Sequence, residues 1–165
     1  MQIRNERPED RTIIGEITTA AFATHPFSQQ TEAAIIDALR EAGALSLSLV
    51  AEDEQDILGH AAFSPVEIDG RPGGWYGLGP ISVRPDRQRQ GIGGALLREG
   101  LARLKDQGAA GVVLVGDPAY YTRFGFDYLP GLRFDGAPAR NFMGLVLNGP
   151  RATGSVTFHP GFGAH

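Results

Sequence analysis

The sequence predicts one α/β (α+β mixed) domain spanning residues 1–165, with a mixed, mostly antiparallel sheet flanked by helices. Stretches with alternating or continuous apolar residues, typical of strands, are interspersed with stretches of helical periodicity. In the second half of the chain, a strand pattern is followed by a helix pattern and then by a continuous apolar stretch at 111–115. This order is typical of a right-handed parallel crossover, so at least one strand pair is expected to be parallel.

Composition and charge narrow the class of protein. With 42% hydrophobic and 21% charged residues, the chain resembles an ordinary globular protein. It has no membrane-length apolar run and no secretory-signal pattern, so we expect a cytoplasmic protein without a membrane partner. A net charge of -4 argues against a nucleic-acid partner. The absence of cysteine excludes thiolate chemistry, and the histidine spacing predicts no metal site.

The first half of the chain predicts a strand, two helices and a hairpin. A short strand at 1–6 is stopped by Pro8, and helical spacing follows to about residue 22. Pro26 separates this helix from a second one at about 29–41. Strict alternation at 45–52, an acidic turn and a further strand pattern at 57–68 then predict an antiparallel hairpin.

The second half predicts a strand at 75–83, a helix at 92–105 and the apolar strand at 111–115. After a short helix near 119–124, strands are expected near 126–128, 142–147 and 155–158. Gly79-Pro80 interrupts the first of these strand patterns, because proline removes a ladder donor and glycine often marks a bulge. We therefore expect backbone groups near this dipeptide to be free for a ligand.

The loop "RQRQGIGG" at 87–94 lies between that strand and the following helix. A helix begins with backbone N–H groups that lack intrahelical partners and with the positive end of its dipole. The glycines let a ligand approach these donors, and Arg87 and Arg89 add positive charge. The loop therefore favours a phosphate ligand over a mere glycine-rich turn.

Two familiar phosphate loops do not match this stretch. A P-loop requires Lys-Ser/Thr after its last glycine, whereas Ala95 and Leu96 follow here. A dinucleotide fingerprint requires a third glycine at position 96, which is leucine. A nucleotide- or dinucleotide-binding domain is therefore a weaker alternative.

Two motifs together resemble the GNAT (GCN5-related) N-acetyltransferase superfamily. Gln88-x-x-Gly91-x-Gly93 is similar to its acetyl-CoA motif, and "YTRFGF" at 121–126 to its Tyr-x-[Lys/Arg]-x-Gly-Phe segment. Further segments, among them "LGHAAFSPV" and "GWYGLGPISV", resemble the bacterial YhbS-like subgroup, and the resemblance covers nearly the whole chain. It implies a GNAT fold in which acetyl-CoA, the co-substrate, binds between two splayed central parallel strands.

The resemblance also implies which residues bind acetyl-CoA. The pantetheine arm is expected on the main chain of Ile81, Ser82 and Val83. The pyrophosphate is expected on the backbone N–H groups of the loop, namely Gln88, Arg89, Gln90, Gly91, Ile92, Gly93 and Gly94.

Acetyl transfer to an amine requires a neutral amine, a stabilised oxyanion and a proton for the departing thiolate. In this motif context Tyr121 is the expected catalytic proton donor, with Tyr120 as the alternative. A backbone N–H near Ile81 is a candidate oxyanion donor. The general base stays open between His60, Glu67 and water. Without cysteine, a ternary complex is favoured over a thiol acetyl-enzyme.

The predicted function is thus acetyl transfer from acetyl-CoA to an amine of a small-molecule or peptide acceptor. The first two helices and the loop at 23–30 are expected to build the acceptor site. The main alternative is a non-catalytic acyl-CoA-binding or regulatory module on the same fold. The sequence is compatible with a monomer or a homodimer.

Overall fold

The structure is a computed structural model that describes all residues 1–165. Its helices are α1 (Arg11–Phe22), α2 (Glu32–Glu41), α3 (Ile92–Asp106) and α4 (Pro118–Tyr121). Its strands are β1 (Gln2–Asn5), β2 (Leu47–Asp53), β3 (Asp56–Ile68), β4 (Arg71–Val83), β5 (Gly111–Val115), β6 (Leu132–Arg133), β7 (Phe142–Val146) and β8 (Gly154–Thr157).

The sheet confirms the predicted mixed α/β class. Its main path has the hydrogen-bonding order β1-β2-β3-β4-β5-β7, and β8 pairs with both β3 and β6. The β4–β5 pair is parallel, as the crossover pattern predicts, whereas β1–β2, β2–β3 and β5–β7 are antiparallel. None of the helices combines the length and apolar character needed to cross a membrane.

The chain divides into two compact units. The first comprises Met1–Ser64, Gly79–Gly100 and Pro160–His165, and the second comprises Pro65–Leu78 and Leu101–His159. The long strands β3 and β4 and the helix α3 each begin in one unit and end in the other.

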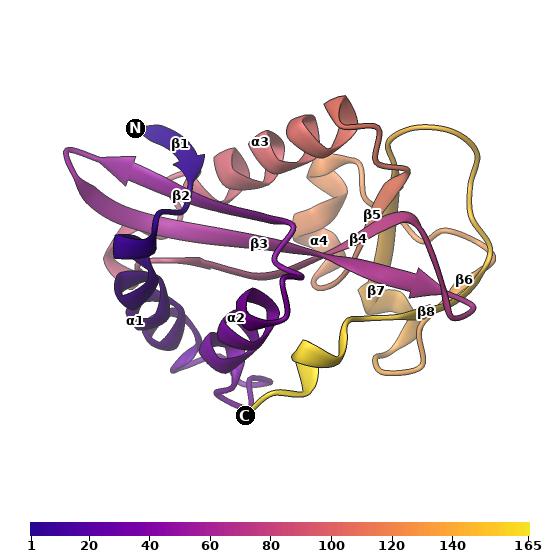
Figure 1. Ribbon diagram of the computed structural model, residues 1–165, viewed down its shortest axis with the longest axis horizontal. Helices are drawn as coiled ribbons and strands as arrows, with labels where there is room; N and C mark the ends of the chain where they lie inside the picture. The colour runs from indigo at the N-terminus through magenta and orange to yellow at the C-terminus, as the bar shows by residue number, and fades with distance from the viewer. The chain divides into compact units, whose positions relative to one another are not determined.

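In the first unit, α1 and α2 lie side by side on the β2–β3 hairpin (Figure 1). The periodic apolar residues of both helices face the sheet, as their spacing predicts. Burying one such aliphatic side chain contributes about 1.5–3 kcal/mol. This core cluster is formed by Ile14, Ile17, Ile36, Val50 and Ile57.

The first turns of α3 pack against β3 within the same unit. The Phe63 ring occupies the space that a Cβ at Gly100 would need, so glycine is required for this close approach. A Cβ at Gly59 would lie 2.8 Å from the Ser82 carbonyl oxygen and 3.2 Å from the Leu96 side chain. Glycines thus let α3 and β4 approach β3 closely.

In the second unit, β5 lies between β4 and β7. Its parallel register with β4 joins Trp75, Tyr76 and Gly77 to residues 111–113, and β4 continues beyond Gly77 into the first unit. The Trp75 ring packs against the backbone of Gly111. The apolar cluster around it comprises Val66, Trp75, Val113, Leu132, Phe142 and Val156.

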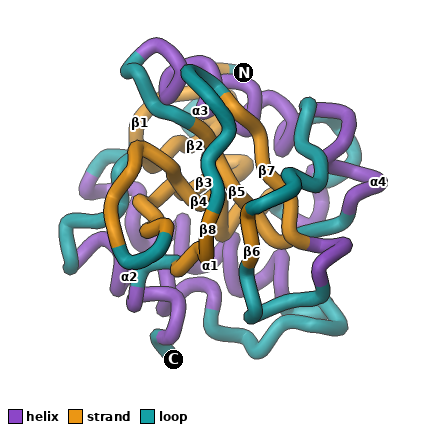
Figure 2. The backbone as a smooth tube through the Cα atoms, turned by 90° about the vertical axis from the view of Figure 1, so that its right-hand side faces the viewer, coloured by secondary structure: helices purple, strands orange, loops and turns teal.

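One strand expectation is corrected by the structure. The strand expected near 126–128 is reduced to an isolated bridge between Asp127 and Gly144. Instead, the chain forms β6, which pairs in parallel with β8 through Leu132 and Arg133. The surrounding residues are mostly loop, drawn in teal in Figure 2. A two-residue strand depends on its partner, so local sequence gives little signal for it.

Candidate active site

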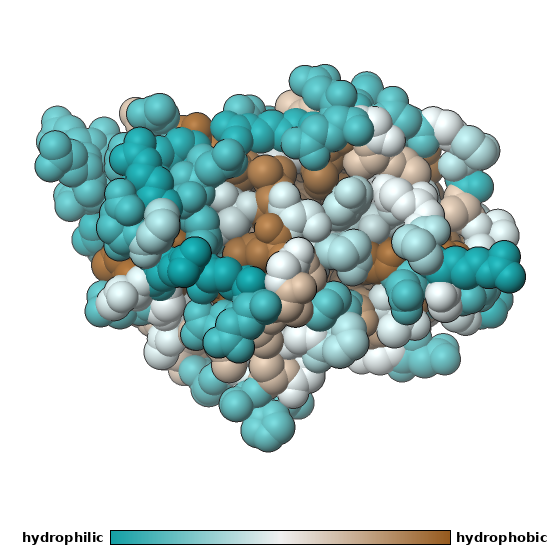
Figure 3. Space-filling model, in the orientation of Figure 1, coloured by the Kyte–Doolittle hydropathy of each residue, from teal (hydrophilic) through white to brown (hydrophobic).

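The glycine-rich loop is an exposed connection between β4 and α3. After a short 3₁₀ turn, Pro85–Arg87, residues 88–91 are all exposed, and Ile92 is buried at the start of α3. Hydrophilic residues cover much of the face shown in Figure 3, so an exposed polar loop is not distinctive by itself. Its backbone conformation is the distinguishing feature.

Two residues of this loop have left-handed backbone conformations. Arg89 has φ +64° and Gly91 has φ +83°. Left-handed residues in a turn can direct successive N–H groups into an anion-binding concavity. A Cβ at Gly91 would meet no heavy atom within 4 Å, so the space beside it is open. The Gly91 carbonyl accepts from the Ala95 N–H at 3.0 Å, which makes it the first acceptor of the helix.

Three hydrogen bonds fix the chain from Arg84 to Gln88: one to β3, one within the turn and one to the end of β4. The Arg84 N–H donates to the Leu58 carbonyl at 2.8 Å, and the Arg87 N–H donates to the Arg84 carbonyl at 2.8 Å. The Gln88 amide Nε2 donates to the Val83 carbonyl at 3.1 Å. The side chain of Gln88 therefore helps to shape the loop.

The β4 segment before the loop presents its residues on alternate faces. Ser82 is buried, and its hydroxyl lies 3.3 Å from the Thr18 hydroxyl, which donates to the Ile14 carbonyl at 2.7 Å. The Ser82 side chain thus connects β4 to α1. Ile81 and Val83 point to the other face and are half-buried. Upstream, Gly79-Pro80 has a cis peptide bond, and Gly79 has φ +141°.

Tyr121 is the last residue of α4 in the second unit. Asp117 caps this helix, since its carboxylate accepts from the Ala119 N–H at 3.0 Å. The Tyr121 ring is half-buried and packs edge-on against Phe126, with centroids 6.2 Å apart. Burial raises the pKa of Tyr121 to about 12, mainly because the phenolate would lose hydration. The hydroxyl therefore keeps its proton at neutral pH and can donate it.

Tyr120 has a different environment from Tyr121. Its ring packs against Phe124 at 5.3 Å, and the Arg123 guanidinium lies 5.1 Å from its centroid. These contacts are those of a packing residue.

Two residues that position Tyr121 were not identified from the sequence. The Tyr121 ring fills the space where a side chain at Gly116 would lie. Asn141 holds Gly116 through two hydrogen bonds. Its main-chain carbonyl accepts from the Gly116 N–H at 2.9 Å, and its side-chain amide donates to the Gly116 carbonyl at 3.0 Å. A glycine directly after the apolar strand is the only local signal, and nothing in the sequence pairs it with Asn141.

His60, a candidate base, is fully buried in the first unit. Its Nε2 lies 2.7 Å from the Ser48 hydroxyl, which donates to Glu6 at 2.5 Å. Because Ser48 donates to the carboxylate, its oxygen accepts from His60, so the proton of the neutral ring is on Nε2. Nδ1 has no hydrogen-bond partner.

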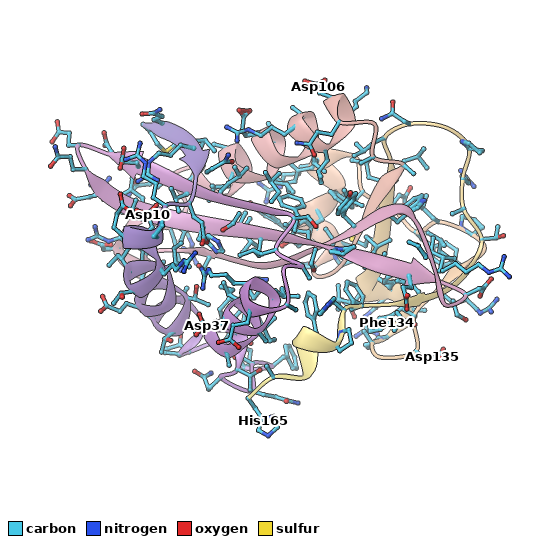
Figure 4. The ribbon with its side chains drawn as sticks, viewed as in Figure 1. Asp10, Asp37, Asp106, Phe134, Asp135 and His165 are labelled. Atoms are coloured by element: carbon cyan, nitrogen blue, oxygen red, sulfur yellow. The ribbon has the colours of Figure 1, made fainter.

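The chain of contacts from His60 extends to α2. Arg40 donates two hydrogen bonds to Glu6, at 2.8 and 2.9 Å, and one to Asp37 at 2.9 Å. Asp37 lies on α2 and is labelled in Figure 4. Burial lowers the pKa of His60 to about 4, with Arg40 opposing and Glu6 favouring protonation. His60 is therefore a neutral and weakly basic group at neutral pH.

Glu67, the other carboxylate considered as a base, lies on the second-unit end of β3. It is exposed and pairs in register with Thr157 of β8.

A pocket of about 900 Å³ lies elsewhere in the first unit. Its wall contains Arg4, which is held by Asp10 at 2.7 Å and Glu52 at 2.8 Å. Asp10, labelled in Figure 4, precedes α1. Arg84 and Pro85 are the only lining residues that adjoin the glycine loop in sequence. The pocket is built around a structural ion-pair cluster, and we assign it no step in catalysis.

Comparisons with known proteins agree with the motifs. The acetyltransferase (GNAT) family model matches residues 11–126. The chain is 41% identical over 128 residues to YhbS of Escherichia coli K12, named an uncharacterized N-acetyltransferase, covering 77% of this chain and 74% of the relative.

Two solved structures are also similar over almost the whole chain. A GNAT family acetyltransferase from Brucella melitensis in complex with acetyl-CoA is 50% identical, with a TM-score of 0.88 and coverage of 98% of this chain and 97% of the other. Escherichia coli YhbS in complex with CoA is 36% identical, with a TM-score of 0.87 and coverage of 98% and 91%.

Proposed function

This chain belongs to the GNAT family of acetyltransferases, and from that premise we propose that it transfers an acetyl group from acetyl-CoA directly to an amine in a ternary complex. The observation that carries the proposal is the exposed loop before α3, with its left-handed residues at 89 and 91. Two similar proteins are described in complex with acetyl-CoA or CoA, which supports the same co-substrate for this chain.

The residues of the loop fit a pyrophosphate group. The first N–H groups of α3 have no intrahelical acceptor, and Gly91 leaves open space in front of them. A charged acceptor would strengthen each such bond to about 1.5–3 kcal/mol. The proposed backbone donors run from Gln88 to Gly94.

The β4 main chain is proposed to bind the pantetheine arm at Ile81, Ser82 and Val83. The Ser82 side chain is already engaged with Thr18, so only its backbone is available. The half-buried side chains of Ile81 and Val83 would provide apolar contacts beside the arm. The N–H near Ile81 is the proposed oxyanion donor.

Tyr121 is proposed to protonate the leaving thiolate. The amine nitrogen attacks the thioester carbonyl carbon, the C–S bond breaks, and the sulfur takes the hydroxyl proton of Tyr121. A proton released by the new amide nitrogen restores the tyrosine through solvent. The pKa of Tyr121, raised to about 12, keeps the donor protonated before each turnover.

Water is proposed as the group that first deprotonates the amine. His60 is wholly buried and engaged with the Ser48 hydroxyl, so it is not accessible to an incoming ammonium group. Glu67 is exposed on β3, where its main chain pairs with β8. Because the chain has no cysteine, no acetyl-cysteine intermediate enters this scheme.

The acceptor is proposed to be an amine bound by α1, α2 and the loop at 23–30. Ser28 donates to both carboxylate oxygens of Glu32, at 2.7 and 2.8 Å. The Gln30 side chain donates to the Phe22 carbonyl at 2.8 Å. These bonds hold the loop in a defined shape, which is what a specific acceptor site requires.

The test is an amine panel in which release of CoA thiol is followed with a thiol reagent. The protein contributes no thiol background, since it lacks cysteine. We expect Tyr121→Phe to lower kcat by about 100-fold while the acetyl-CoA Kd stays unchanged. Tyr120→Phe is the matched control and should retain nearly full activity.

Three outcomes would count against the proposal. Release no faster than hydrolysis with every amine would favour the non-catalytic binding module. Full activity of Tyr121→Phe would remove its role as donor, and a loss confined to Tyr120→Phe would transfer that role to Tyr120.

A further inference from the structure

The short segment Pro160–Gly163 is a 3₁₀ turn that packs on α2 within the first unit. Figure 1 shows this turn in yellow beside that helix. A hydrogen bond of 3.1 Å from the Ala164 N–H to the Gly161 carbonyl closes the turn. Its aromatic residue, Phe162, packs against the apolar cluster formed by Ile35, Leu39 and Ala44. The ring is thus held against one of the two helices to which the acceptor site is assigned.

The Phe162 ring also lies near Gly79 of β4. A Cβ at Gly79 would lie 4.0 Å from the Phe162 Cε1 atom, and outside the flanking residues this is the only heavy atom within 4 Å. In the second unit, by contrast, a Cβ at Gly77 would overlap the Phe158 ring, 2.7 Å away. The space beside Gly79 is therefore open and is bounded by the half-buried ring of Phe162.

This open space lies where the reacting end of the co-substrate is expected, a step that rests on the proposed function. The phosphate donors at 88–94 follow the pantetheine contacts at 81–83 along the chain, so the co-substrate runs along β4 towards lower residue numbers. Its thioester then lies at the Ile81 end, where the oxyanion donor is placed. Gly79 is two residues further, about 6–7 Å along the strand. The body of an attacking amine would therefore lie beside Gly79 and Phe162.

The side chains around this space are apolar. Phe162 and the cluster on which it packs carry no polar side-chain atoms. Glu32, one turn before Ile35 on α2, already accepts two hydrogen bonds from Ser28. An apolar wall binds an apolar group because the contact removes both surfaces from water. It also lowers the pKa of an ammonium group held beside it, which favours the neutral amine that the attack requires.

We propose that the acceptor is a primary amine attached to an apolar group, and that Phe162 is the specificity-determining residue that binds this group. The ring and the aliphatic side chains of α2 contact the apolar part, while the nitrogen reaches the thioester. A polycationic amine would instead place a second ammonium group against the apolar wall, where it loses hydration.

Pentylamine and 1,5-diaminopentane test this selection. The two amines share a five-carbon chain and differ only in the second ammonium group at the far end of the diamine. We expect wild type to show a kcat/KM at least about 10-fold higher for pentylamine, measured by release of CoA thiol. Phe162→Ala should lower the value for pentylamine by about 10-fold, mainly through KM, with an unchanged acetyl-CoA Kd. Phe162→Leu, which keeps an apolar wall, should retain most of the preference.

Phe134→Ala is the matched control for the loss of a half-buried aromatic ring. Phe134 belongs to the core of the second unit, where it packs against Phe142 and Phe158. This variant should be less stable than wild type, yet the ratio of the two kcat/KM values should stay that of wild type.

The outcomes distinguish this inference from the proposed function. Wild type that uses the diamine as well as pentylamine, or only polar amines of the panel, would overturn the inference and leave the proposed function standing. A preference that survives in Phe162→Ala would remove the role of Phe162. An equal loss of preference in Phe134→Ala would show that reduced stability, and not the ring, causes it. Thiol release with no amine at all would overturn both.

Discussion

The Tyr121 ring lies against the backbone of Gly116, in the volume where any side chain at that position would be. Asn141 holds Gly116 in place through two hydrogen bonds, at 2.9 and 3.0 Å. The position of the proposed proton donor is therefore set by a residue that has no functional group. Gly116 and Asn141 act on Tyr121 through packing.

Gly116→Ala is expected to displace the Tyr121 ring. The added methyl group overlaps a ring that is enclosed by Phe126 and Tyr120, so stability should fall by about 1–3 kcal/mol. A misplaced donor should lower kcat by about 10-fold or more. Steady-state kinetics and urea unfolding measure both effects. Gly73→Ala, which meets no atom within 4 Å, is the control and should leave kcat unchanged.

Gly91→Ala tests the glycine loop, and Gly108→Ala, which lies outside the loop, is its matched control. Both glycines have left-handed φ, +83° and +87°, and a Cβ at either position meets no atom within 4 Å. Each substitution should therefore cost about 1 kcal/mol of stability through the backbone alone. Only Gly91→Ala should weaken acetyl-CoA binding, measured by calorimetry. An equal loss of acetyl-CoA affinity in Gly108→Ala would show that reduced stability, and not the loop, causes the weaker binding.

The raised pKa of Tyr121 has a spectroscopic consequence. Burial raises this pKa to about 12. The difference in phenolate absorbance between wild type and Tyr121→Phe should therefore stay near zero up to about pH 11. Ultraviolet absorbance during an alkaline titration measures it. A difference that already develops near pH 10 would contradict the buried, protonated donor.

His60 is expected to make the first unit sensitive to mild acid. An unfolded histidine has a pKa of about 6.5, and burial lowers that of His60 to about 4. Between these values the unfolded chain binds a proton that folded His60 does not, so stability falls as pH decreases. The stability lost in this way is about 2 kcal/mol at pH 5, and on the order of 3 kcal/mol once the pH lies below both pKa values.

Chemical denaturation at about pH 7.5 and pH 5 measures this loss. In His60→Gln the decrease between the two pH values should be smaller by about 2 kcal/mol, whatever the absolute stability of the variant. His165→Gln, which changes an exposed histidine, should behave as wild type. The carboxylates Glu6, Asp10 and Glu52 have lowered pKa values, so the stability that they contribute is lost only at lower pH.

Much of the fold could be predicted because its elements carry strong periodic patterns. The β2–β3 hairpin, α3 and β5 lie where alternation, helical spacing and a continuous apolar run place them. Strands β7 and β8 also lie where strands were expected, whereas the segment from 126 to 133 was predicted poorly. There the isolated bridge at Asp127 and the short β6 depend on partners far along the chain.

The sequence by itself determined the family and the position of the glycine loop, because motifs and backbone-permissive residues are local. Only the tertiary structure decided that Ser82 faces Thr18, that His60 is buried beside Ser48, and that Arg84 is neutralised while Arg87 and Arg89 are not. These properties depend on which groups from distant segments lie within hydrogen-bond distance, and on the hydration each loses there.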